Sequence, residues 1–246
     1  KYGTSLQLDR VVSNTRTAFT LAAEGGIDNE RLVVFQDWAS NVSYLPPNSF
    51  HNHVVEIVNS VSTDADNYFA KFVANNGAAG AGYWKETIDP QVSPGLTPAT
   101  MPHRLRNNAT NSFVLEAVPW VDRSAGDDVT VPHPSFVGKT IKKTFFHDDR
   151  LGFLSEDNAI LSKAKDPFDL YAASARTITA GDPIDVNCAS VRPTKLHAVI
   201  PARQGLVLFS KSAQFLIYAD DGPLTPLSTK IRPISNMEMS DEVDPI

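Results

Sequence analysis

The fold is decided by RLGFLSEDNAILS, residues 150–162, and by its weaker counterpart GLVLFSKSAQFLIY, residues 205–218. In each stretch an apolar run ends in serine, a few polar residues turn the chain, and a second apolar run returns. This pattern predicts two antiparallel strands with a tight connection. Aligning Ser155 with Ser210 gives a period of 55 residues. A period of about 50 is typical of kelch-type propellers, in which four strands form one blade. Two hydrophobic hairpins of any all-β protein would also look alike, so both interpretations stay open here.

Outside these hairpins the chain consists of short apolar or aromatic runs that Pro, Gly, Asn and Asp separate. Such runs predict strands and turns, so the expected fold is mainly β with antiparallel strands. The 17 prolines interrupt longer patterns, and only residues 11–24 could form a modest helix. The expected strands cover residues 31–36, 54–58, 68–73, 83–87, 112–117, 144–146, 151–154, 159–162, 205–210 and 214–218.

Two connecting segments receive a specific interpretation. The glycine-rich run 77–82 lies between two expected strands and is predicted to be a loose hairpin loop. It lacks the helix and the Lys-Ser or Lys-Thr pair that a phosphate-binding loop needs. The polar, proline-containing stretch 220–234 is the expected cover for the edge of the last strand, residues 214–218.

Composition excludes several classes of protein. The chain has 246 residues, of which 42% are hydrophobic and 20% charged, so it can bury a sizeable core. Its net charge is −6 and its longest basic run is Lys142-Lys143, so we expect no tight nucleic-acid binding. Cys188 is the only cysteine, which leaves neither a disulfide framework nor a paired-cysteine zinc site.

The sequence shows no membrane or secretion signal. No stretch approaches the roughly 20 apolar residues of a membrane-spanning helix, and residues 1–20 lack the pattern of a signal peptide. The chain begins at Lys1 and ends in an acidic segment. We therefore expect it to be part of a longer protein, truncated at its C-terminus.

Few residues could carry chemistry. The pair His51 and His53 has a spacing that zinc can use in a strand, but nothing nearby completes a ligand set. A loop that leads into a strand explains the pair more simply. Cys188 lies in an apolar run and is expected to be a buried, unreactive thiol.

A second group combines histidines with pairs of aspartates. A fold could bring these residues together as metal ligands or as acid and base groups. However, each aspartate pair is also a good turn sequence, because Asp side chains bond to the backbone that follows. Since no GxSxG elbow, HExxH helix, P-loop or dinucleotide motif occurs either, we expect no catalytic, cofactor-binding or metal-binding residues. The group comprises Asp127, Asp128, His133, His147, Asp148 and Asp149.

A series of short motifs follows in a fixed order between residues 100 and 190. They are Thr100-Met101-Pro102-His103, Trp120-Val121-Asp122-Arg123, Gly126-Asp127-Asp128, Pro134-Ser135-Phe136-Val137-Gly138, Phe145-Phe146, Arg150-Leu151-Gly152-Phe153-Leu154-Ser155, Leu161-Ser162-Lys163, Asp166 to Phe168 and Asp182-Pro183-Ile184-Asp185-Val186. In order and spacing the series resembles the tail tubular protein B, or tail nozzle, family of short-tailed bacteriophages. The likeness continues more faintly through residues 45–85 and 214–216, whereas residues 1–40 show none.

This resemblance implies a structural protein of the virion tail, made in the bacterial host cytoplasm, and not an enzyme. Six copies of the full-length family protein would form a nozzle with propeller domains around a channel through which DNA passes without specific binding. The adaptor, tail tubular protein A, and the tail fibres would be its neighbours. The family usually has Gly where this chain has Glu156 and Lys165, and Arg where it has Lys163. We expect the lost glycines to alter the turn geometry of one hairpin.

The expected domains are an N-terminal β-rich region, residues 1–99, and propeller-type blades in residues 100–246. Two other functions remain open: a phage-associated carbohydrate-processing enzyme and a host-surface sugar-binding module. The enzyme would need convergent carboxylates, and the module would need exposed aromatic platforms. Trp38, Trp84 and Trp120 could stack on sugars, but each lies in or beside an expected strand and is predicted to belong to the core.

Overall fold

The computed structural model describes residues 38–59, 67–108, 112–188 and 194–240, together with 243 and 245. In these residues the fold is mainly β, as expected, and the only helical elements are the 3₁₀ turns η2 (Val42–Tyr44) and η4 (Pro98–Thr100). The predicted helix at 11–24 and strand at 31–36 lie outside the described residues. No described helix is long and apolar enough to cross a membrane.

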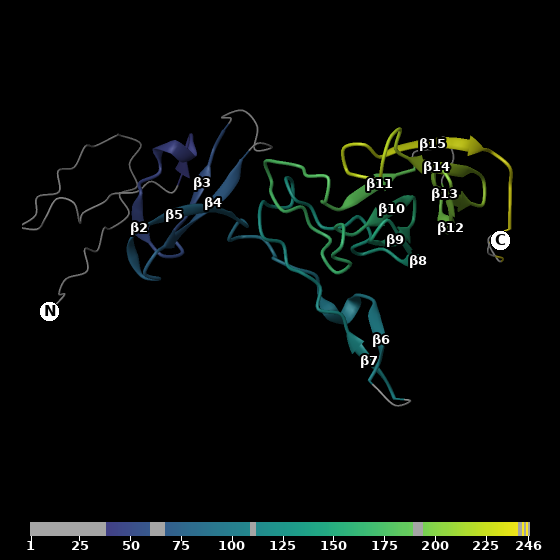
Figure 1. Cartoon of the computed structure of the whole chain (residues 1–246), viewed down its shortest axis with the longest axis horizontal. Helices are drawn as coiled ribbons and strands as arrows, with labels where there is room; N and C mark the ends of the chain where they lie inside the picture. Colours follow the sequence, from purple (N-terminus) through teal and green to yellow (C-terminus); the bar gives the residue numbers. More distant parts are fainter. Residues whose placement is uncertain are drawn as a thin grey trace, which may run out of the picture. The chain divides into compact units, whose positions relative to one another are not determined.

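The first sheet has five strands in the order β1-β3-β4-β5-β2, shown in purple and blue in Figure 1. One face of β3 and β4 carries its buried core: Val55, Ile57, Tyr68 and Ala70. This arrangement follows from the strict alternation of buried and partly exposed residues along β4. The strands are β1 (Trp38–Ala39), β2 (Asn48–Phe50), β3 (Val54–Ile57), β4 (Tyr68–Ala74) and β5 (Ala79–Thr87).

The glycine-rich run is only partly a loop, so its prediction was wrong at one end. β5 begins at Ala79, and residues 79–81 pair with β2. Gly82 lies inside β5. Glycine is needed at this position because a side chain there would collide with the backbone carbonyl of Val73. Glycine was interpreted as a turn signal in the sequence, whereas at position 82 glycine permits a close approach between two strands.

The strands β6 (His103–Asn107) and β7 (Phe113–Ala117) form a separate two-stranded hairpin. His103 pairs with Ala117 at its base, and Asn107 pairs with Phe113 near its tip. Residues 112–117 were expected to form a strand, but the partner strand was missed because its alternate residues are charged or polar.

Two four-stranded antiparallel sheets follow in succession, the first in the order β11-β10-β9-β8 and the second in the order β12-β13-β14-β15. They appear in green and in yellow-green in Figure 1. The two apolar hairpins, residues 150–162 and 205–218, provide the second and third strands of these sheets, which confirms their predicted equivalence. The strands are β8 (Ile141–His147), β9 (Arg150–Ser155), β10 (Asn158–Leu161), β11 (Ile184–Asn187), β12 (Leu196–Ala202), β13 (Gly205–Ser210), β14 (Gln214–Tyr218) and β15 (Lys230–Ser235).

The two sheets share one hydrophobic core. Leu154 and Leu161 of the first sheet belong to the same buried cluster as Leu206, Leu208 and Phe215 of the second. Strand β12 lies close to both β8 and β9. Each sheet therefore covers an apolar face of the other, which is how adjacent propeller blades bury their faces.

Strand β14 is paired on its far side by β15, so the stretch 220–234 contributes the expected cover. Pro233 lies in β15, which is an edge strand of this sheet, where proline is tolerated. The tryptophan prediction was partly wrong. Trp84 and Trp120 pack against buried clusters, whereas the Trp38 side chain in the edge strand β1 is 52% exposed.

Both positions where the related family usually has glycine keep a left-handed backbone in this chain. Glu156 has a φ of +49° and Lys165 has a φ of +65°. The expectation that one hairpin differs in turn geometry from the family stays a prediction. Tight pairing of β9 with β10 holds Glu156 in the left-handed conformation, although a side chain is disfavoured there.

Candidate functional site

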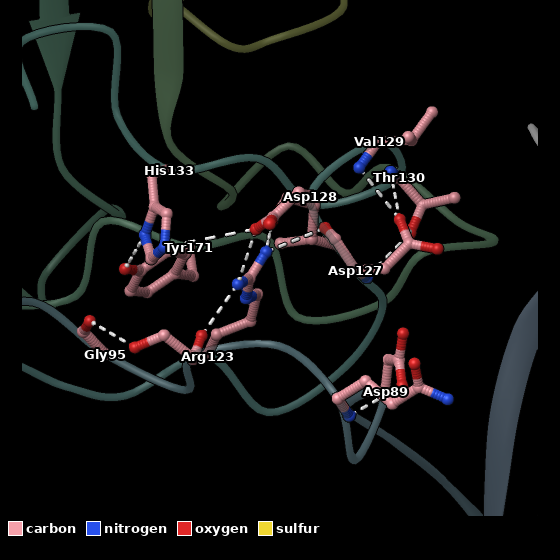
Figure 2. A network of polar contacts seen from close by, with 12 residues as sticks. Asp89, Gly95, Arg123, Asp127, Asp128, Val129, Thr130, His133 and Tyr171 are labelled. Atoms are coloured by element: carbon pink, nitrogen blue, oxygen red, sulfur yellow. Dashed lines mark hydrogen bonds and ion pairs between the residues drawn. The ribbon is translucent and has the colours of Figure 1, made fainter.

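Three of the six polar residues that the sequence singled out, Asp127, Asp128 and His133, collect around a buried arginine (Figure 2). The side chain of Arg123 is fully buried, and its guanidinium donates hydrogen bonds of 2.7 Å to the carbonyl oxygens of Asp127, Val131 and Ser93. A fourth bond, 2.8 Å long, reaches the carboxylate of Asp128. A buried guanidinium needs several such bonds because an unpaired charge is costly away from water. Both terminal nitrogens of Arg123 are paired, whereas its Nε has no hydrogen-bond partner among the described residues.

Asp127 stabilises its own turn. One carboxylate oxygen accepts hydrogen bonds from the backbone N–H groups of Val129 and Thr130 at 2.8 Å and from the Thr130 hydroxyl at 2.9 Å. Burial alone would raise the pKa of Asp127, but these bonds and the charge on Arg123 outweigh it and lower the pKa. A carboxylate held ionised by three donors is a turn anchor and a poor general acid, as the turn prediction implied.

His133 and Tyr171 complete the network on the opposite side of the arginine. The Tyr171 hydroxyl lies 2.6 Å from Nδ1 of His133, and the Arg123 guanidinium lies 5.8 Å from the centre of the Tyr171 ring. Burial raises the pKa of Tyr171 to about 12, so its hydroxyl stays protonated and can donate to the imidazole. Sequence reasoning did not single out Tyr171, which is 38 positions from its partner.

The other candidate residues lie in a different turn. Asp148 and Asp149 connect β8 to β9, and both have a positive φ, +48° and +58°, as in a type I′ turn. Nε2 of His147 lies 3.4 Å from a carboxylate oxygen of Asp148. The structure thus divides the six residues between the Arg123 network and this hairpin turn. In the described part of the chain no group of three His, Cys, Asp or Glu could hold a metal ion.

His147 and Asp148 also line a cavity of about 600 Å³ beside the β8–β9 turn. Its wall carries groups of both signs, including Arg203, Arg232 and Asp220. This mixed lining favours no single class of charged ligand.

The remaining sequence candidates have structural roles. His51 and Asn52 form a turn between β2 and β3, and Nδ1 of His51 accepts a 3.3 Å bond from the N–H of Ala74. The loop interpretation of the histidine pair is therefore confirmed. Cys188 is buried, and burial raises its pKa to about 12, which agrees with the expected unreactive thiol.

A second buried arginine, Arg150, was not predicted to have a role of its own. Arg150 begins β9, and its guanidinium donates to the carbonyl oxygens of Ser162, Asp182 and Ala180 at 2.7–2.8 Å. Burial lowers the pKa of Arg150. The carboxylate of Asp182 meanwhile accepts from the backbone N–H groups of Ala173 and Thr179. The available signal was a lone arginine within an apolar strand motif, because a charged side chain buried in such a strand needs hydrogen-bond partners.

These arginines hold the long loops around the first four-stranded sheet, and the described polar side chains mainly form hydrogen bonds with backbone groups of this chain.

Residues 6–246 match the family model of the bacteriophage nozzle protein. The chain is also similar to the tail tubular protein gp12 of Escherichia phage T7, with 35% identity over 208 residues. That match covers 85% of this chain and 25% of the T7 protein, so the chain spans about a quarter of the relative's length. Because the family model matches residues 6–246, almost the whole chain, the chain belongs to the bacteriophage nozzle protein family.

Proposed function

We propose that the chain is part of a structural subunit of a bacteriophage tail, and that six full-length copies surround a channel for genome ejection. The observation that carries this proposal is the pair of successive four-stranded sheets with a shared core, in a chain that matches the nozzle family over residues 6–246. Each sheet covers an apolar face of its neighbour, so further blades in the longer protein would extend the stack into a propeller.

The proposed domain division follows the sheets. The five-stranded sheet ends at Thr87, and the first four-stranded sheet begins at Ile141. Glu86 of β5 links the two regions, because its carboxylate accepts hydrogen bonds from the Ser174 hydroxyl at 2.7 Å and from the Ala175 N–H at 2.6 Å. We therefore propose residues 1–99, which contain the five-stranded sheet, and residues 100–246, which contain the two four-stranded sheets, as the two regions.

The proposed mechanism is passive conduction. A channel for DNA must not retain its cargo, and a chain with a net charge of −6 repels phosphate groups instead of releasing counterions onto them. Electron microscopy of the full-length protein should show rings of six subunits around an open channel. Duplex DNA should bind only weakly, even at low salt. A full-length protein that remains monomeric, or that binds DNA tightly at physiological salt, would contradict the proposal.

We further propose that the protein has no hydrolytic activity. The carboxylates of Asp127 and Asp128 already bond to the turn and to Arg123, and this use leaves no free acid and base pair in the network. Purified protein should release no sugar from peptidoglycan or host polysaccharide above background. The decisive variant is Asp149→Asn, since Asn tolerates the positive φ of this position. Hydrolysis that disappears in the folded variant would favour the enzyme alternative.

The proposed partners are the adaptor, tail tubular protein A, and the tail fibres, within the virion tail. The T7 relative bears the name of a tail tubular protein, which supports an assembly role for this chain. Co-expression with the adaptor should give a complex that survives gel filtration. Retention on a polysaccharide column in the absence of other tail proteins would instead favour the sugar-binding alternative.

A further inference from the structure

Two lysines lie directly opposite each other on one face of the five-stranded sheet. Lys71 of β4 pairs with Lys85 of β5, and directly opposite residues project from the same face of a sheet. The other face of the two strands carries Tyr68 and Trp84, which belong to the core of this sheet. The lysine face contributes no side chain to the three buried clusters of the described residues. Lys85 is exposed and Lys71 is partly exposed.

No acidic side chain neutralises the lysine pair. Among the residues that the structure describes, neither ammonium group takes part in an ion pair. Glu56 is on the same face, opposite Phe69, but its carboxylate accepts a 3.1 Å hydrogen bond from Asn67. Like charges directly opposite each other destabilise a sheet. The pair therefore has a cost that the described residues do not offset, and a bound anion would remove this cost.

The charge and spacing of the pair fit a phosphate monoester. Directly opposite Cβ atoms are about 4.5–5.5 Å apart, so the ammonium groups of Lys71 and Lys85 can contact the same small anion. A phosphate monoester carries a charge of about −1.5 to −2 at pH 7 and has three acceptor oxygens. It can therefore neutralise both lysines, whereas a carboxylate has the charge to neutralise one.

An exposed aromatic ring accompanies the pair. Tyr83 is two residues from Lys85 in β5, so it is on the same face, about 7 Å along the strand. Its side chain is 56% exposed. This spacing fits a ligand in which a short linker joins a planar ring to the phosphate, because the ring can stack on tyrosine while the lysines bind the phosphate. An extended nucleic acid needs a longer basic groove, and this face has two lysines beside Glu56 in a chain of net charge −6.

We propose that Lys71, Lys85 and Tyr83 form a binding site for a small phosphate monoester that carries a planar ring, such as a nucleoside monophosphate. The phosphate neutralises the two lysines, so its binding stabilises the five-stranded sheet. The site belongs to this sheet alone and depends neither on a ring of six subunits nor on the channel.

Calorimetric titration of the full-length protein with adenosine monophosphate tests the site. Inorganic phosphate lacks the ring and should bind at least about fivefold more weakly. Lys71→Gln should weaken binding of adenosine monophosphate by about tenfold, since one charged hydrogen bond is lost. Tyr83→Thr keeps a residue that favours strands and should reduce this binding to the level of inorganic phosphate. The matched control is Lys142→Gln in β8, an exposed lysine with no residue directly opposite, which should stay within about twofold of the wild type.

Lys85→Glu separates a binding site from a purely structural role of the lysines. It places opposite charges at the paired positions, so it should raise the midpoint of urea unfolding in phosphate-free buffer by about 0.2 M. The same substitution should abolish binding of adenosine monophosphate. A structural role would instead predict a lower midpoint.

The proposal is overturned if the wild type does not bind adenosine monophosphate, if inorganic phosphate binds equally well, or if Lys71→Gln or Tyr83→Thr leaves binding unchanged. A lower urea midpoint for Lys85→Glu would overturn it as well. Oligothymidylate of ten nucleotides is the last probe, and binding more than about tenfold tighter than that of adenosine monophosphate would indicate a surface for extended nucleic acid instead. Tail assembly is measured separately, so failure here leaves the proposed function intact.

Discussion

Replacing Arg150 by methionine tests whether buried guanidinium groups hold the first four-stranded sheet to its loops. The side chain is 2% exposed and donates to three carbonyl oxygens. A hydrogen bond from a charged group contributes about 1.5–3 kcal/mol, so loss of all three bonds would cost at least about 4 kcal/mol. Methionine also removes the cost of keeping a charge away from water, which offsets part of this loss. We expect the free energy of unfolding to fall by about 3–4 kcal/mol.

The assay is urea unfolding followed by tryptophan fluorescence, because Trp120 lies 6.1 Å from Phe153 of the same sheet, measured between ring centres. With a urea dependence of about 2–3 kcal/mol per molar, the midpoint should fall by roughly 1–2 M. The control is Arg203→Met, the same substitution at an exposed arginine, which should change the unfolding free energy by less than about 0.5 kcal/mol. Equal effects of the two substitutions would refute the bonding argument.

Three further predictions concern turns, packing and pH. Glu156→Gly should stabilise the protein by about 0.5–1 kcal/mol in urea unfolding, because glycine tolerates the φ of +49°; a lower midpoint would contradict this. Gly152→Ala should cost about 1–3 kcal/mol, since a side chain there would collide with the Phe145 ring, whereas the nearest atom to a side chain at Gly181 is Thr179 Oγ1 at 3.9 Å, so Gly181→Ala should cost much less. The pKa of Asp127 is lower in the folded protein than its ordinary value of 3.8, so its stabilisation is present above about pH 4 and is lost as pH falls through the folded-state pKa. Asp127→Asn should therefore flatten the pH dependence of the unfolding free energy between about pH 5 and 2, and an unchanged dependence would disprove the role of this carboxylate.

The four strands of the two apolar hairpins could be predicted from sequence, whereas β11, β12 and the strands with polar faces were not. β9, β10 and β14 are almost wholly buried, and β13 alternates buried with partly buried residues, so each of them contains an apolar run that the sequence shows clearly. The edge strands β6 and β15 carry Arg, Lys or Pro at exposed positions and therefore resemble loops in sequence. Hydrogen-bond pairing with a neighbouring strand determines such segments, and pairing is not visible in one strand's own residues.

The polar site was likewise only partly predictable from sequence. The turn roles of Asp127 and Asp149 could be predicted because Asp bonds to adjacent backbone. The central roles of Arg123 and Arg150 could not, since their carbonyl partners lie up to 30 and 32 positions away. Carbonyl groups occur at every residue, so sequence does not indicate which ones a buried guanidinium will reach.

The shared core between the two four-stranded sheets governs the order in which the chain can fold during synthesis. Strands β8 to β11 pair only with their neighbours in sequence, so this sheet can form as soon as residue 187 has left the ribosome. Its apolar residues, among them Leu154 and Leu161, then stay exposed until β13 and β14 arrive with Leu208 and Phe215. At about 5–20 residues per second this interval lasts a few seconds. Translation speed between residues 187 and 218 therefore sets how long the nascent nozzle chain is open to aggregation or to a chaperone.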